Sequence, residues 1–286
     1  SAVIIGAGAV ALEFASLWNA AGCEVTLLIR KDRVLSTWER RASMTLTREL
    51  KRRGVNVIAR TAVDRVDTGA NLGATVHYRQ GDSDEDRTAY GEVVLAAIGR
   101  VPNTDADWFR SSGLKLDERG YVTVDGYGRT NLDGVWALGD ITPGHALAHR
   151  AFEQGITIAE KIAGADPKPV LDDTVPQVVF SFPEAASVGL TLDQAKARED
   201  VVEPKETAYP MLSNARMLMS GEGGSMTVVS GAFANNPDMQ VVLGVHIVSP
   251  IASDLIAEAE QLVGNRVPLA DAARLTHPHP TFSETL

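Results

Sequence analysis

The end of the chain carries two residue types that together perform acid–base chemistry, the imidazole of His279 and the carboxylate of Glu284. A histidine exchanges protons near neutral pH, and a neighbouring carboxylate orients its ring and favours its charged form. The same segment also fits a structural interpretation, because Thr281 and Glu284 have the spacing of a capping box at a helix N-terminus. The local pattern alone favours capping and leaves the acid–base interpretation open.

A second pattern of residues that could do chemistry lies at the start of the chain. It is a Gly-x-Gly-x-x-Ala turn formed by Gly6, Gly8 and Ala11. It lies between an apolar run, Val3 to Ile5, that predicts a buried strand and a helical pattern that begins at Val10. In this setting the first glycine permits a tight turn, the second lets a pyrophosphate approach, and the alanine lets the helix pack closely on the strand. Because a helix N-terminus also favours phosphate, we predict a dinucleotide-binding site.

Basic residues at the end of the next predicted strand, 24–29, bear on which dinucleotide binds. An NAD site usually has an acidic residue here for the ribose 2′-hydroxyl, whereas this chain has Ile29 followed by Arg30 and Lys31. Guanidinium and ammonium groups suit a 2′-phosphate, so the sequence favours NADPH over NADH. The alternative is a solvated basic turn that has no contact with the cofactor.

A third pattern lies in the middle of the chain, where residues 130–140 predict a strand that ends in Asp140. Leu147, Ala148 and His149 then open a predicted helix. A carboxylate at a strand end accepts hydrogen bonds from sugar hydroxyls, and a helix N-terminus stabilises negative charge. These residues predict a second phosphate- or sugar-binding corner.

The patterns between these residues predict the elements that position them. Residues 1–103 alternate strands and helices, which indicates a Rossmann-like unit, with an antiparallel meander over 62–90. After a linker at 167–175 that carries proline and aspartate, the pattern changes to α+β. We therefore expect an α/β protein with domains at 1–103, 104–170 and 171–286. In the last domain, strands are predicted at 177–182, 225–231 and 241–248, and helices at 192–199, 253–263 and 268–275.

The composition excludes several classes of function. The 286 residues are 44% hydrophobic and 22% charged, which is typical of a globular protein long enough for two or three domains. The formal net charge of −10 argues against a nucleic acid or an anionic membrane as the main partner. The single cysteine, Cys23, cannot form an internal disulfide or a Cys-only metal site, and we predict no metal site. With no signal peptide and no apolar run near the ~20 residues of a membrane span, we expect a cytoplasmic protein.

Five stretches resemble, in their order along the chain, the flavoprotein pyridine-nucleotide disulfide oxidoreductases. All five in order are more specific than any one alone, and together they span essentially the whole sequence. That family begins with an FAD-binding segment carrying a redox-active Cys-x-x-x-x-Cys pair, and this sequence has no counterpart to it. The resemblance therefore implies a fragment that starts at the NAD(P) domain. The stretches are GAGAVALE at 6–13, AIGRVPN at 97–103, TNLDGVWALGD at 130–140, LAHRAFEQG at 147–155 and HPHPTFSE at 277–284.

The resemblance implies a fold and a role for each matching position. The fold is a Rossmann-like NAD(P) domain, the C-terminal part of an FAD domain and an α+β dimerisation domain that forms a homodimer. Asp140 would hold the FAD ribityl chain, and the Leu147–His149 region would meet the flavin ring. With the upstream motifs present, His279 is expected to be the catalytic base, paired with Glu284 and reaching into the partner's active site. The positions expected to bind NAD(P) are Gly6, Ala7, Gly8, Ala9, Val10, Ala11, Glu13, Ile29, Arg30, Lys31, Val63 and Gly99.

The implied activity is that of an FAD-dependent NAD(P)H:disulfide oxidoreductase acting on a small-molecule or protein-bound disulfide. Hydride would pass between nicotinamide and flavin, and His279 would exchange protons with thiols. The last two stretches most resemble the dihydrolipoamide dehydrogenase branch. Ile29 and Arg30 depart from that branch and resemble glutathione reductase, although the further arginine expected near Ser36 is absent.

Two other functions remain open from the sequence. One is an NAD(P)H:quinone reductase on the same scaffold, which needs FAD but no cysteine pair. The other is an inactive nucleotide-binding module that forms dimers. We expect this chain alone to lack disulfide reductase activity, because it does not contain the redox-active cysteines.

Overall fold

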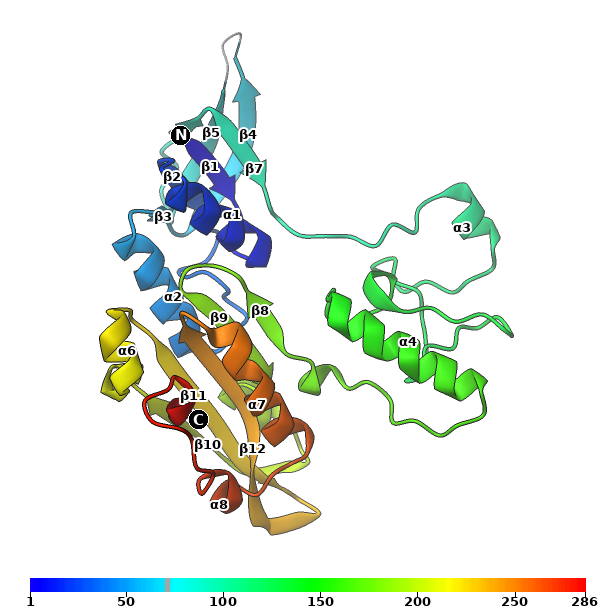
Figure 1. The fold of residues 1–286 in the computed structure, drawn as a ribbon. Helices are drawn as coiled ribbons and strands as arrows, with labels where there is room; N and C mark the ends of the chain where they lie inside the picture. Colours follow the sequence, from blue (N-terminus) through cyan, green and yellow to red (C-terminus); the bar gives the residue numbers. More distant parts are fainter. Residues whose placement is uncertain (70–72) are drawn as a thin grey trace. The chain divides into compact units, whose positions relative to one another are not determined.

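The computed structural model describes residues 1–69 and 73–286 (Figure 1). Contacts within the chain divide it into two compact units. The first unit joins Ser1–Gly99 to Pro176–Leu286, so the predicted dinucleotide and C-terminal domains pack together. The second unit is Arg100–Val175. The predicted mixed α/β class is confirmed.

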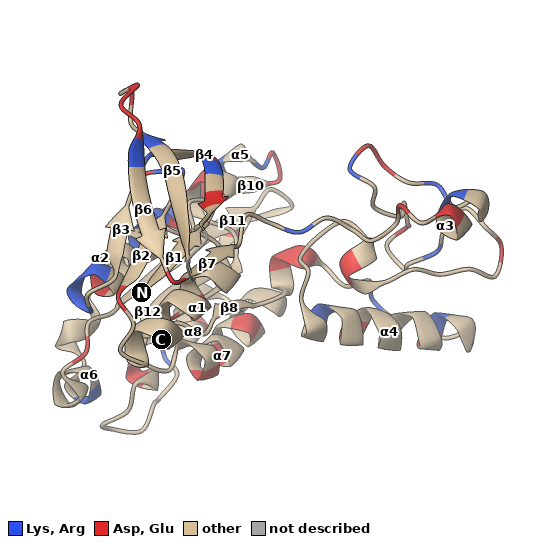
Figure 2. Ribbon diagram, turned by 90° about the horizontal axis from the view of Figure 1, so that it is seen from above, with Lys and Arg blue, Asp and Glu red and all other residues tan. Residues whose placement is uncertain are grey.

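The first unit opens with a four-stranded parallel sheet in the order β3-β2-β1-β7. Two helices connect its strands, and their buried apolar residues share one core with the sheet. The second helix is capped by Glu39, whose carboxylate accepts the N–H groups of Arg41 and Ala42 at 2.6 and 2.7 Å. Its exposed side is basic (blue on α2 in Figure 2). The elements are β1 (Ala2–Ile5), α1 (Ala9–Ala20), β2 (Val25–Leu28), α2 (Arg40–Arg52), β3 (Asn56–Ile58) and β7 (Val93–Ala96).

The antiparallel meander predicted for 62–90 is present as a three-stranded sheet, β4-β5-β6. Residues 70–72 of that range lie outside the described residues. Val76 and Tyr78 of the meander pack against Val3 and Leu28 of the parallel sheet, so the two sheets share a small core. The strands are β4 (Thr61–Thr68), β5 (Ala74–Gln80) and β6 (Arg87–Gly91).

The C-terminal part of the first unit is a five-stranded antiparallel sheet in the order β10-β11-β12-β9-β8. Helix α7 lies along β9 and β12 and buries its apolar face in their core (Figure 1). The predicted strand at 177–182 ends early, and β9, β10 and α6 are additions to the predicted set. The elements are β8 (Gln177–Val179), β9 (Glu184–Gly189), α5 (Leu192–Ala197), β10 (Val201–Tyr209), α6 (Ala215–Ser220), β11 (Ser225–Phe233), β12 (Asn236–Ser249), α7 (Ala252–Gly264) and α8 (Leu269–Ala272).

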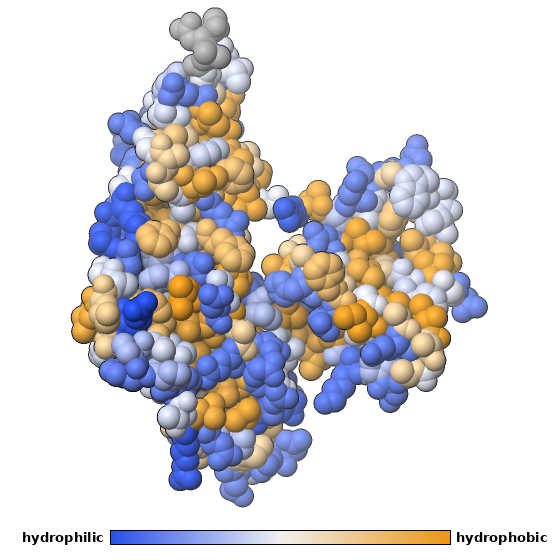
Figure 3. Space-filling view, viewed as in Figure 1, coloured by the Kyte–Doolittle hydropathy of each residue, from blue (hydrophilic) through white to orange (hydrophobic). Residues whose placement is uncertain are grey.

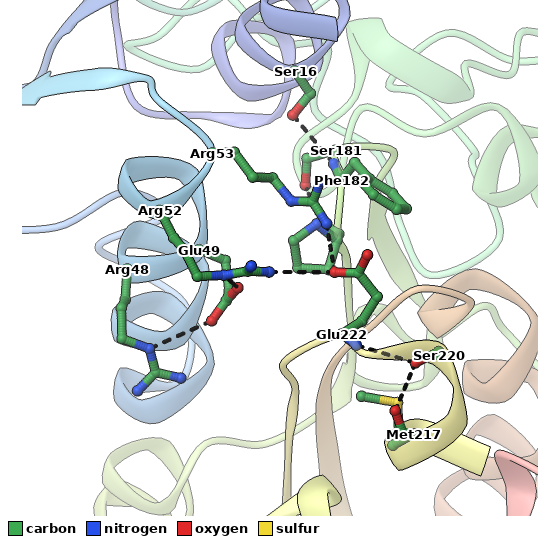
Figure 4. Close-up of polar contacts among 11 residues, drawn as sticks. Ser16, Arg48, Glu49, Arg52, Arg53, Ser181, Phe182, Met217, Ser220 and Glu222 are labelled. Carbon is green, nitrogen blue, oxygen red and sulfur yellow. Dashed lines mark hydrogen bonds and ion pairs between the residues drawn. The ribbon is translucent and has the colours of Figure 1, made fainter.

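Charged and aromatic contacts at the end of α2 join the two halves of the first unit (Figure 4). Arg53 forms an ion pair with Glu222 and lies 3.9 Å from the centre of the Phe182 ring. Arg52 reaches the same Glu222 carboxylate at 3.3 Å. The N–H of Phe182 donates to the hydroxyl of Ser16 in α1 at 3.2 Å. The loop between β8 and β9 is therefore held by both helices of the dinucleotide domain.

The second unit consists mostly of turns around two helices, α3 (Asp107–Ser111) and α4 (Ala148–Ile162). The strand predicted over 130–140 is wrong. The segment folds back on itself, because the N–H of Val135 donates to the carbonyl of Leu132 at 3.2 Å and Gly134 has a φ of +72°. Its backbone groups are thereby used locally, and Gly139–Ile141 forms a 3₁₀ turn. Across both units, no helix formed by the described residues is long and apolar enough to cross a membrane.

Candidate functional site

A cavity of about 530 Å³ lies at the carboxyl edge of the parallel sheet, where β1, β2 and β7 end. In sheets of this type the carboxyl edge is the usual place for ligands. The structure brings seven of the predicted cofactor residues together here. They are Gly6, Ala7, Gly8, Arg30, Lys31, Val63 and Gly99.

The glycine turn has the shape that the sequence predicts. Gly6 has a φ of +142°, and a Cβ at this position would lie 2.2 Å from the carbonyl oxygen of Ala97. At Gly8 an added Cβ would meet no described atom within 4 Å, so the space beside the backbone is open. Ala11 is fully buried against the sheet. Because the N-cap residue of α1 is Gly8, which has no side chain to cap the helix, the first N–H groups of α1 are available to an anion.

Of the residues that directly follow β2, some line the cavity and one lies in the core. Arg30 and Lys31 are exposed and line the cavity, together with Ser36. Ile29 is fully buried in the core. Its N–H donates to Ile58, and its carbonyl accepts the N–H of Thr61 at 3.0 Å. The side chain of Ile29 therefore packs in the core and is not among the residues that line the cavity.

Three other predicted residues on α1 lie outside the cavity lining. Ala9 and Val10 are exposed in the first turn. The carboxylate of Glu13 accepts the N–H of Phe180, just after β8, at 3.0 Å. The sequence patterns did not predict several residues that line the cavity. Most of them lie at or near the ends of strands, which is a signal that could have identified them. These lining residues are Ile5, Leu28, Ser36, Thr61, Ala62, Ala97 and Ile98.

The His279–Glu284 pair is formed. Nδ1 of His279 lies 2.7 Å from Oε1 of Glu284, and Oε2 of Glu284 accepts the N–H of Thr281 at 2.8 Å. A carboxylate only accepts hydrogen bonds, so Nδ1 carries the proton and Nε2 of the neutral ring keeps its lone pair. The Thr281 N–H and, next, His279 hold the pKa of Glu284 below its usual value.

The capping interpretation of the same segment is realised only in part. Glu284 makes its half of the capping box through the Thr281 N–H. The Thr281 hydroxyl donates to the carbonyl of Pro278 at 2.6 Å, and Ser283–Thr285 forms a 3₁₀ turn rather than a longer helix. The capping contact and the His–Glu pair therefore coexist on the two oxygens of one carboxylate.

The predicted flavin residues lie in the second unit. Asp140 sits in the 3₁₀ turn with its side chain 60% exposed, and Nη1 of Arg100 is 4.0 Å away. Leu147 precedes α4 as an apolar N-cap, and Ala148 and His149 are exposed in the first turn. The side-chain amide oxygen of Gln154 in α4 accepts the N–H of Gly139 at 2.8 Å. This bond holds the turn that carries Asp140 against α4.

Within residues 1–69 and 73–286, no three His, Cys, Asp or Glu side chains are grouped so that they could hold a metal ion. Cys23 is a free thiol of intermediate exposure.

Two family models match the chain. Residues 1–155 match the model described as pyridine nucleotide-disulphide oxidoreductase, and residues 175–286 match the model for its dimerisation domain. The chain belongs to the pyridine nucleotide-disulphide oxidoreductase family. Among curated members, it is 36% identical to dihydrolipoyl dehydrogenases of Cupriavidus necator and Geobacillus stearothermophilus, in each case over 99% of this chain and 58% of the relative. The chain thus spans less than two thirds of the length of these family members.

The chain also resembles solved structures in its fold. The chain superposes on LpdA from Mycobacterium tuberculosis with a TM-score of 0.85 and 29% identity, covering 99% of this chain and 59% of that one. It also superposes on RclA from Escherichia coli, described as an HOCl-induced flavoprotein disulfide reductase, with a TM-score of 0.83. RclA is 23% identical over 99% of this chain and 62% of its own, so this second similarity concerns the fold alone.

Proposed function

We propose that the chain is the dinucleotide-binding and interface part of an FAD-dependent NAD(P)H:disulfide oxidoreductase of the dihydrolipoyl dehydrogenase type. The observation that carries the proposal is the His279–Glu284 pair, whose histidine side chain is 72% exposed and hydrogen-bonded to the carboxylate. A quinone or dye reductase reduces its substrate at the flavin and does not require a base that deprotonates thiols. A disulfide reductase needs one, because thiols lose and regain protons during exchange.

The cavity at the edge of the parallel sheet fits a pyridine dinucleotide. The open space beside Gly8 and the start of α1 suit the pyrophosphate, and Val63 and Gly99 lie along the same cavity. Arg30 and Lys31 are placed to meet a ribose 2′-phosphate, which supports NADPH over NADH. Ser36 lines the same cavity without adding charge.

The residues of the second unit fit part of a flavin site. The exposed carboxylate of Asp140 would accept hydrogen bonds from ribityl hydroxyls, and the start of α4 at Leu147, Ala148 and His149 would face the negative edge of the ring. FAD, when bound, supplies the group that takes hydride from the nicotinamide and passes electrons to a disulfide. Within this chain, the contribution to that site is therefore orientation and charge stabilisation.

The role of His279 follows from the atoms that it leaves available. The neutral ring takes a proton from an attacking thiol at Nε2, and the resulting imidazolium stays bound to Glu284 through Nδ1. The same Nε2–H then returns its proton to the thiolate that leaves the disulfide. The proton count balances, since one thiol is deprotonated and one is formed.

We further propose that the chain forms a homodimer through residues 171–286, with the base of one subunit serving the active site of its partner. The match to the dimerisation-domain model supports this proposal. So do the exposed apolar side chains Leu212, Leu218 and Met219, which lie in and before α6. Hydrophobic surface is visible at the left-hand edge of Figure 3, the side on which Figure 1 shows α6. Apolar groups of this size that are exposed together commonly mark an interface.

The proposal is tested by expressing the complete reading frame that contains this sequence and measuring NAD(P)H oxidation with lipoamide, glutathione disulfide and a quinone as acceptors. Turnover with a disulfide, by a protein that carries FAD, is the expected result. Turnover with the quinone alone would favour the quinone reductase. A complete protein that binds nucleotide and turns over none of the three would be a nucleotide-binding module.

A further inference from the structure

Residues 277–281 form a short arch at the end of the chain, and each of its ends is tied to a different helix. Nε2 of His277 lies 2.7 Å from Oε1 of Glu258, which belongs to α7. At the other end, the carbonyl of Thr281 accepts the side-chain N–H of Asn214, the residue that precedes α6, at 2.9 Å. The two histidines of the arch thus have different surroundings, with His277 15% exposed and His279 72% exposed.

Both anchors are firmly placed in the C-terminal domain. Helix α7, which carries Glu258, buries six residues against the sheet. Asn214 is only 4% exposed, and its side-chain oxygen caps α6 by accepting the N–H of Met217 at 3.0 Å. Just beyond the arch, Phe282 packs on the same core, with Arg216 of α6 5.8 Å from the centre of its ring. Both anchors therefore attach the arch to elements that share the hydrophobic core of the C-terminal domain.

The arch itself has little freedom between its anchors. Pro278 and Pro280 flank His279, and each ring fixes its own backbone φ. Because His279 and Glu284 are both accessible to water, their hydrogen bond alone gains little over solvation. Such a contact is well populated when the backbone already holds the two groups in place.

We propose that Asn214 and the Glu258–His277 pair are positioning residues for His279. They hold the arch so that Nδ1 of His279 meets Glu284 and Nε2 points away from the carboxylate. This inference rests on the proposed function for its biological meaning, since it concerns the same base. Its structural content is that two contacts remote from the imidazole set which ring nitrogen carries the proton.

Two substitutions remove the anchors one at a time. Asn214→Asp keeps an oxygen to cap α6 but loses the N–H that Thr281 accepts. Glu258→Ala removes the partner of His277, whereas Glu258→Gln keeps an acceptor and is the conservative rescue. Glu260→Ala is the matched control, because Glu260 lies on the same helix and hydrogen-bonds to Gln261. Near-ultraviolet circular dichroism identifies any variant that does not fold.

The readout is the ratio of the Nδ1–H to the Nε2–H tautomer of His279, from ¹⁵N–¹H correlations of the 286-residue chain at alkaline pH. We expect the ratio to fall roughly two- to tenfold in folded Asn214→Asp or Glu258→Ala, as for the loss of one hydrogen bond. Glu258→Gln and Glu260→Ala should stay near the parent ratio. A fall in either anchor variant supports the anchor that it removes, and an unchanged ratio in every folded anchor variant overturns the proposal.

This measurement requires neither flavin nor thiol, so its failure is separate from a failure of the proposed function. An unchanged tautomer ratio would leave His279 as the candidate base without these positioning residues. Conversely, a complete protein that reduces no disulfide would end the proposed function and leave the tautomer result as it stands.

Discussion

Oε1 of Glu284 lies 2.7 Å from Nδ1 of His279, while the second oxygen of the same carboxylate accepts the N–H of Thr281. The backbone bond holds the carboxylate independently of the histidine. The imidazole therefore meets an acceptor that is already oriented, which fixes its tautomer and directs its second nitrogen away from Glu284. The carboxylate of one capping pattern thus also pairs with the His279 ring.

The pKa of Glu284 offers a first prediction. It is held below its usual value, mainly by the Thr281 N–H and then by His279. Because the folded-state pKa is the lower one, the carboxylate contributes stability above the unfolded-state pKa and loses it as the pH falls through the folded-state pKa. A ¹³C carboxyl titration should show this low midpoint, and His279→Gln should raise it only in part. A midpoint at the usual glutamate value would contradict the geometry.

Arg30 is predicted to recognise the 2′-phosphate of NADPH. Arg30→Glu should weaken NADPH binding by more than NADH binding, by roughly ten- to a hundredfold in the ratio, since hydrogen bonds to charged groups are worth about 1.5–3 kcal/mol. Calorimetric titration of the chain with both nucleotides measures the ratio. Arg48→Glu makes the same charge change at an exposed site of α2 outside this cavity and is the control. Equal losses for both nucleotides would remove Arg30 from the 2′-phosphate site.

A substitution at Ser36 tests the predicted position of the NADPH 2′-phosphate by a gain of affinity. Ser36 lines the cavity with Arg30 and Lys31 but is neutral. Ser36→Arg would place a second guanidinium there, and we expect NADPH to bind about tenfold more tightly with NADH little changed. Ser36→Gln, similar in length but uncharged, should leave the preference near that of the parent. If the arginine raised the affinity for both nucleotides alike, the 2′-phosphate would lie elsewhere.

Replacing Gly6 or Gly8 by alanine is predicted to have different effects, a loss of stability at Gly6 and a loss of dinucleotide affinity at Gly8. A Cβ at Gly6 would collide with the Ala97 carbonyl in a backbone conformation that only glycine adopts easily, so Gly6→Ala should lower the free energy of unfolding by at least about 1–3 kcal/mol. A Cβ at Gly8 would meet no described atom within 4 Å. Gly8→Ala should therefore fold normally and lose dinucleotide affinity. Denaturant unfolding with nucleotide titration separates the two effects, and an unstable Gly8→Ala would refute this division.

Local patterns predicted much of the dinucleotide domain. The turn at Gly6 and Gly8 lies between a short strand and the start of a helix, and each glycine has its own steric role. The dinucleotide-binding turn could therefore be predicted from neighbouring residues in the sequence. Ile29 could not be assigned as readily, because its side chain is fully buried in the core although the next residues, Arg30 and Lys31, are exposed. Glu13 likewise depends on a distant loop, the one that carries Phe180.

The features that the sequence did not predict have two different causes, a local turn and contacts between distant residues. Residues 130–140 contain apolar side chains typical of a strand, but Gly134 and local hydrogen bonds turn the segment back on itself. The anchors of the arch at 277–281 join Asn214 to Thr281 and Glu258 to His277, across separations that no local pattern encodes. The pairing of His279 with Glu284 could be predicted from the family resemblance, while the contacts that hold the arch could not.

The central claim, that His279 is the acid–base group of a disulfide reductase, is tested most directly by His279→Gln in the complete protein. The rate of NAD(P)H-dependent lipoamide reduction is compared with the rate of quinone reduction by the same preparation. We expect lipoamide reduction to fall by about 10²- to 10⁴-fold, as for loss of a general acid–base group, while quinone reduction is retained. Lipoamide reduction that stays within a few-fold of the parent rate would contradict the account.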